Sequence, residues 1–80
     1  MNKELTLEDR IANYIEDLEY RANGMKWING ACVEVEDLEV DKDENTVRCK
    51  VTLDYQADQR REVYSNCEYP LDVILKALGE

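Results

Sequence analysis

Apolar residues recur at helical spacing near the start of the chain. Thr6 is a good N-cap, and Glu8 and Asp9 place negative charge in the first turn, where the helix dipole favours it. Asn23-Gly24 is a stop signal, because Gly24 takes a left-handed conformation at low cost. The pattern predicts an amphipathic helix with one apolar stripe, made of Leu7, Ile11, Tyr14, Ile15, Leu18 and Ala22.

The segment from Met25 to Gly30 separates this helix from the strands. Asn29-Gly30 is a strong signal for a tight turn. We expect a loop that tucks Trp27 onto the core, since tryptophan is highly buried on average. The alternative is that Trp27 serves as an anchor in an interface.

The first predicted strand runs from about Ala31 to Val40. Its apolar residues change parity halfway, from Val33 and Val35 to Leu38 and Val40. A regular strand cannot place all four on one face, because side chains alternate. One extra residue near Glu36-Asp37 would bring them together, so we predict a β-bulge there.

Two more strands follow, after a polar turn from Asp41 to Asn45. The next strand alternates most regularly, with Val47, Cys49, Val51, Leu53 and Tyr55 facing one way. The third spans about Arg61 to Cys67. We expect Val63, Ser65 and Cys67 to face inward, and Glu62, Tyr64 and Asn66 to face outward.

A short closing helix completes the predicted fold. Pro70 suits its first turn, Gly79 ends it, and its inner stripe is Leu71, Ile74, Leu75 and Leu78. The order is α-β-β-β-α with short connections. This predicts an α+β fold in one domain, 1–80, with a three-stranded antiparallel meander and both helices on one face.

Composition narrows the classes of function. The 80 residues carry a net charge of −9, which disfavours direct binding to nucleic acid or to an anionic membrane. Acidity favours basic partners, although it also keeps a small protein soluble. No apolar run approaches the length of a membrane span, and Met1–Glu4 lack a secretory pattern. We therefore expect a cytoplasmic protein.

Residues for catalysis or metal binding are scarce. There is no histidine, Ser65 is the only serine, and no Gly-rich phosphate loop is present, so an enzyme is not expected. The three cysteines form no CxxC pair, and they are expected to be small apolar side chains on strands: Cys32, Cys49 and Cys67. The turn 41–45 departs from the EF-hand pattern, so we expect neither a metal nor a cofactor.

The sharpest local feature is a run of acidic residues on and after the first strand. Outward residues on a strand lie about 6–7 Å apart, a spacing comparable to that of phosphates along DNA. The run could therefore occupy a basic groove, or it could only protect an edge strand from aggregation. The candidate partner-binding residues are Glu34, Glu36, Asp37, Glu39, Asp41, Asp43 and Glu44, with Glu16 and Asp17 as helper charges.

A second candidate surface is the open face of the sheet. It is expected to carry Arg48, Lys50, Thr52 and Tyr64 with acids around them. This mixed charge is explained either by cross-strand pairing or by an interface.

The predicted layout resembles that of two groups of proteins. The α-β-β-β-α order is similar to that of double-stranded-RNA-binding domains. Those domains need basic residues at the start of the last helix, whereas the corresponding stretch here, 69–76, contains a single basic residue, Lys76. Size, acidity and layout also resemble small phage-encoded anti-CRISPR proteins and other DNA mimics. That resemblance implies an inhibitor that blocks the basic surface of a nucleic-acid-handling protein, in the host-cell cytoplasm if the chain is phage-encoded. The alternative is a general adaptor or immunity-type interaction domain that binds its partner through the sheet face and Trp27. One form of this alternative is a homodimer, in which the partner is a second copy of the chain.

Overall fold

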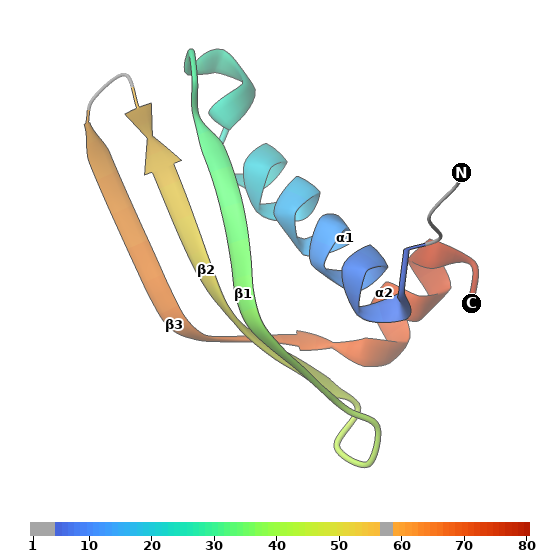
Figure 1. Cartoon of the computed structure of the whole chain (residues 1–80). Coiled ribbons are helices and arrows are strands. Elements are labelled where there is room, and N and C mark those ends of the chain that lie inside the picture. Colours follow the sequence, from blue (N-terminus) through green and yellow to red (C-terminus); the bar gives the residue numbers. More distant parts are fainter. Residues whose placement is uncertain (1–4, 57–58) are drawn as a thin grey trace.

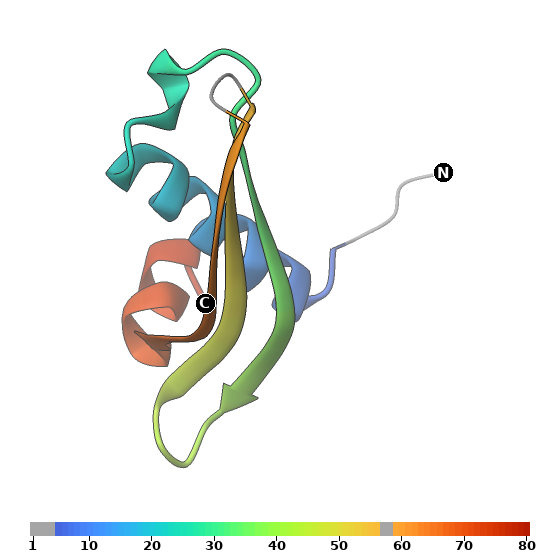
Figure 2. The ribbon, with the colours of Figure 1, turned by 90° about the vertical axis from the view of Figure 1, so that its left-hand side faces the viewer.

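The computed structural model describes residues 5–56 and 59–80. Three antiparallel strands form one sheet in the order β1-β2-β3, and both helices lie against the same face of it (Figures 1 and 2). The predicted α+β fold is confirmed. Its elements are α1 (Leu7–Ala22), a 3₁₀ turn η1 (Met25–Trp27), β1 (Cys32–Asp41), β2 (Thr46–Tyr55), β3 (Arg60–Pro70) and α2 (Leu71–Leu78).

Side chains cap both helices at their N-terminal ends. Thr6 and Asp9 form a capping box, with each side chain accepting a hydrogen bond from the other residue's backbone N–H. At α2 the cap comes from the β1–β2 turn, because Asn45 Oδ1 accepts the Asp72 N–H at 2.8 Å and Asn45 Nδ2 donates to Asp72 Oδ1 at 3.0 Å. This turn and α2 are therefore held together by polar contacts as well as by packing.

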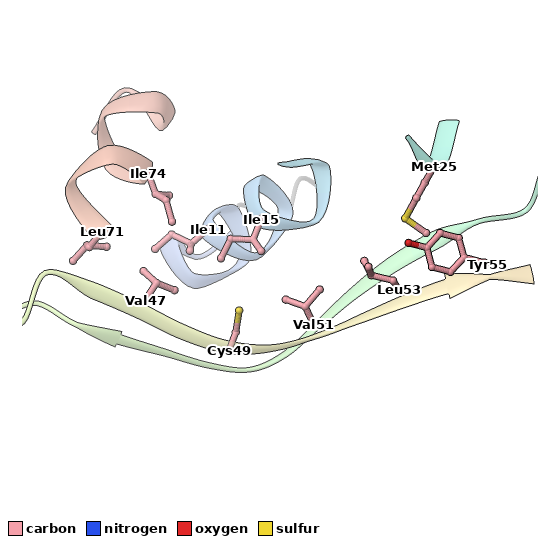
Figure 3. Packing of buried hydrophobic residues seen from close by; sticks show 10 residues of the cluster. All are labelled: Ile11, Ile15, Met25, Val47, Cys49, Val51, Leu53, Tyr55, Leu71 and Ile74. Carbon is pink, nitrogen blue, oxygen red and sulfur yellow. The ribbon is translucent and has the colours of Figure 1, made fainter. Parts of the chain in front are cut away.

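The core lies between β2 and the helical layer (Figure 3). All five residues of the predicted inner face of β2 are buried, which confirms the alternation expected from the sequence. β2 is the central strand, so its inner face has neighbours on both sides as well as the helices above it. The buried apolar residues are Ile11, Ile15, Met25, Val47, Cys49, Val51, Leu53, Tyr55, Leu71 and Ile74.

The bulge predicted in β1 is present. Glu36 lies opposite Lys50 and Glu39 lies opposite Arg48, so two residues of β1 face a single residue of β2. The first of the two, Asp37, has a φ of 55°. The extra residue restores the inward direction of the apolar positions on both sides of the bulge.

A second bulge, in β3, overturns part of the prediction for that strand. Cys67 pairs with Cys49 and Tyr64 pairs with Val51, so Ser65 and Asn66 together face one residue of β2. The prediction assumed unbroken alternation from Val63 to Cys67. The additional residue in the bulge exchanges the inward and outward directions of the β3 residues that precede it. Ser65, expected to face inward, is exposed, as is Asn66.

The consequence is visible in the first half of β3. Val63, expected inward, lies opposite Thr52 on the outer face and is 50 % exposed. Glu62 and Tyr64, expected outward, instead share the inner parity with Leu53 and Val51, although Tyr64 remains 49 % exposed. Only Cys67 keeps the inward direction that the sequence predicted.

The expectation for Trp27 is also wrong. Its side chain is 80 % exposed, whereas Met25 in the same short turn is fully buried. Gly24, with a φ of 62°, turns the chain so that Met25 points at the sheet. Lys26 Nζ covers one side of the indole, 4.8 Å from the ring centroid.

Candidate functional site

Four of the predicted acidic residues form one row on the outer face of the sheet. They lie opposite outward residues of β2, and no helix among residues 5–56 and 59–80 covers this face (Figures 1 and 2). β1 pairs with β2 alone, so the row follows a free edge of the sheet. We call these residues the acidic row: Glu34, Glu36, Glu39 and Asp41.

The remaining acids of the run lie around the row. Asp37 is exposed at the bulge, and Asp43 and Glu44 are exposed in the β1–β2 turn. The backbone N–H of Glu44 donates to Asp41 Oδ1 at 3.0 Å, so the Asp41 carboxylate also closes this turn.

The two helper charges do not join the acidic row. Glu16 and Asp17 lie on α1, which packs against the other face of the sheet. They border a shallow pocket of about 280 Å³ next to residues 31–33, at the start of β1. Asp17 is also engaged by Arg21, whose Nη2 lies 2.7 Å from Asp17 Oδ2. Glu16 and Asp17 therefore place negative charge on the helical side of the β1 edge and do not lengthen the acidic row.

Two bases of β2 lie beside the acidic row, and both are paired across strands. Lys50 Nζ is 3.9 Å from Glu36 Oε1, and Arg48 Nε is 3.3 Å from Glu68 Oε2 on β3. Within the described ranges, Glu34 and Glu39 form no ion pair. Cross-strand pairing thus accounts for these two bases, and neither of them forms an ion pair with Glu34 or Glu39.

The structure adds one acid that the sequence did not single out for binding. An open pocket of about 560 Å³ lies between the start of α1 and the end of β1, and Glu8 lines it with Glu39, Asp41 and Asp43. Lys42 and Arg48 complete its polar lining. Glu8 precedes the acidic run by more than 20 residues, so only the packing of α1 along β1 brings them together. The pocket is suited to a cationic side chain.

The groups with shifted pKa values lie away from the acidic row. Burial raises the pKa of the Cys49 thiol to about 11, and burial together with a hydrogen bond to Glu19 raises that of Tyr69. A hydrogen bond to Glu62 raises the pKa of the exposed Tyr64. In the described part of the chain, no group of three or more His, Cys, Asp or Glu side chains is placed to hold a metal ion.

Comparison with known proteins found no match to this chain among family models, curated proteins or solved structures. None of the helices in the described ranges has both the length and the apolar character needed to span a membrane.

Proposed function

We propose that this chain is a non-catalytic binding protein whose acidic row docks on the basic surface of a nucleic-acid-handling protein and blocks it, as anti-CRISPR proteins and other DNA mimics do. One observation supports this above the others. Glu34, Glu36, Glu39 and Asp41 share an uncovered face along a free sheet edge. A strand spaces such carboxylates at about 6–7 Å, comparable to phosphates along DNA.

The charge distribution fits a basic partner. The net charge of −9 attracts a cationic surface over distance and speeds encounter. At short range, Glu34 and Glu39 offer carboxylates without an ion-pair partner in the described residues. The pocket beside Glu8 gives an arginine or lysine of the partner a place to insert between acids.

The test compares two double variants with the same change in net charge. Glu34→Gln with Glu39→Gln removes the unpaired charges of the acidic row, whereas Glu62→Gln with Glu80→Gln removes two acids elsewhere. Each is added to purified nucleic-acid-handling proteins, CRISPR effector complexes first, and binding of target DNA is measured. We expect the wild type and the control to inhibit, the row variant to lose about tenfold in potency, and inhibition to weaken as salt rises.

Two results would count against this proposal. Equal losses in the two double variants would show that total charge matters and not the row, as expected if the acids only protect the edge or maintain solubility. Inhibition that is unaffected by either variant would remove the row from the interface altogether. Thermal melts of both variants establish that each remains folded.

The exposure of Trp27 favours a second candidate, a general adaptor or immunity-type domain. An indole that is 80 % exposed, next to a fully buried Met25 in the same turn, presents a large apolar group on a supported element. Under this alternative, Trp27→Ala weakens partner binding or self-association more than the loss of Glu34 and Glu39. Sedimentation at increasing protein concentrations measures self-association of the wild type and of Trp27→Ala, and so tests whether Trp27 holds a homodimer together.

A further inference from the structure

Two cysteines that are distant in sequence face each other in the sheet. Cys49 on β2 and Cys67 on β3 are direct partners in the antiparallel register. Both lie on the inner face, since Cys49 belongs to the core and Cys67 packs against it. The third cysteine, Cys32, pairs with Asp54 on the outer face of β1. All three are free thiols in this structure.

The register places Cys49 and Cys67 directly opposite each other, which brings their Cβ atoms close to the separation that a disulfide needs. Directly opposed residues in an antiparallel pair have Cβ atoms about 4.5–5.5 Å apart. A disulfide needs Cβ atoms about 3.5–4.5 Å apart, so a small approach of the strands is enough. The bulge at Ser65 and Asn66 lies immediately beside Cys67, and a bulge interrupts the ladder locally. β3 can therefore adjust at this point without shifting its whole register.

We propose that Cys49 and Cys67 are a thiol–disulfide site that a small-molecule disulfide, such as oxidised glutathione, converts to a cross-strand bond. This inference is independent of the proposed function. It gives a chemical role to residues that the sequence indicated only as small apolar side chains on strands.

Exposure sets the order of the steps. Cys67 is half-buried and accessible from solvent, whereas Cys49 is only 3 % exposed. The Cys67 thiolate attacks one sulfur of the small disulfide, forming a mixed disulfide and releasing one small thiolate. Cys49 then loses its proton, and its thiolate attacks the Cys67 sulfur and expels the second small thiolate. Two protein thiols are oxidised, and one small disulfide is reduced to two thiols.

The test treats the whole chain with oxidised glutathione, then blocks remaining thiols with a maleimide under denaturing conditions and measures the intact mass. We expect the number of free thiols to fall from three to one, and peptide mapping to join Cys49 to Cys67. Dithiothreitol should restore all three. In Cys32→Ser the number of free thiols should fall from two to none at the same rate, because Cys32 lies on the other face of the sheet and takes no part in the reaction.

Variants of the pair distinguish the two steps. Cys49→Ala should stop at a stable glutathione adduct on Cys67, and Cys67→Ser should leave Cys49 unreacted. The inference is overturned if glutathione accumulates on Cys67 of the wild type without closure onto Cys49. It is equally overturned if the disulfides formed are between chains through Cys32. Because the wild type and Cys32→Ser give the decisive readouts, poor folding of a core variant does not affect the conclusion.

Discussion

The Tyr69 hydroxyl on β3 donates a 2.7 Å hydrogen bond to Glu19 Oε2 on α1, joining positions 50 residues apart in the chain. The other oxygen of Glu19 accepts from Asn23 Nδ2 at 3.3 Å, so both carboxylate oxygens have donors. Tyr69 lies opposite Val47 on the inner face, beside the core. This contact ties the edge strand β3 to the last turns of α1.

Tyr69→Phe should lower the free energy of unfolding by about 1–2 kcal/mol, because the partly buried, charged carboxylate of Glu19 loses the hydrogen bond that Tyr69 donates to it. The matched control is Tyr64→Phe, which removes an exposed 3.0 Å hydrogen bond to Glu62 and should cost less than about 0.5 kcal/mol. Urea denaturation at neutral pH measures both. Equal losses would show that the bond to Glu19 has no special weight.

The bulge in β1 depends on a backbone conformation that few side chains tolerate. Asp37 has a φ of 55°, where aspartate is accepted and β-branched residues are not. Asp37→Val should therefore cost about 1–2 kcal/mol, whereas Asp37→Gly should stay within about 1 kcal/mol of the wild type. Glu34→Val likewise replaces an acidic residue with valine at an exposed position of the same strand, and it is the control. Similar stabilities for the two valine variants would argue against strain at residue 37.

The two bulges show how far apolar pattern alone determines strand faces. In β1 the inward residues change parity between Val35 and Leu38, so the extra residue could be predicted from the sequence. In β3 the apolar Val63 and Cys67 share one parity, which favours unbroken alternation. Tyr64 has the opposite parity, and it is the one residue between them whose inward direction reveals the bulge. Edge strands bury few side chains, and the period-2 signal is correspondingly weak there.

The candidate site divides in the same way. The acidic row was predictable, because outward positions follow once the bulge is placed in β1. The contribution of Glu8 to the pocket was not, because it depends on the direction in which α1 packs along β1. Nor does the chain spacing of Cys49 and Cys67 suggest a pair, since their opposition follows from the β2–β3 register and its bulge.

Sequence alone also could not decide which apolar residue of the 3₁₀ turn enters the core. Met25 and Trp27 are two positions apart, and at three residues per turn they point to different sides. Met25→Ala should cost about 2–4 kcal/mol, because its side chain is fully buried. Trp27→Ala should change stability by less than about 0.5 kcal/mol. Trp27 fluorescence provides a second readout, since an indole already 80 % exposed should shift little on unfolding.

Alkaline pH should weaken the fold through Cys49. Burial raises the pKa of this thiol from 9.0 to about 11, so the folded state holds the proton more tightly than the unfolded state does. The resulting stabilisation is fully present below about pH 9 and is lost as the pH rises toward 11.

Between these pH values the free energy of unfolding should fall by on the order of 2 kcal/mol, because each unit of pKa difference corresponds to about 1.4 kcal/mol. The raised pKa of Tyr69 adds a further loss above its ordinary value of 10.0. Denaturant titrations of wild type and Cys49→Ala from pH 7 to 11, with a reductant present, isolate the thiol. The alanine variant starts less stable but should lose less over this range, because only the tyrosine contribution remains. Parallel curves for the two proteins would mean that Cys49 ionises as readily in the folded state as in the unfolded one.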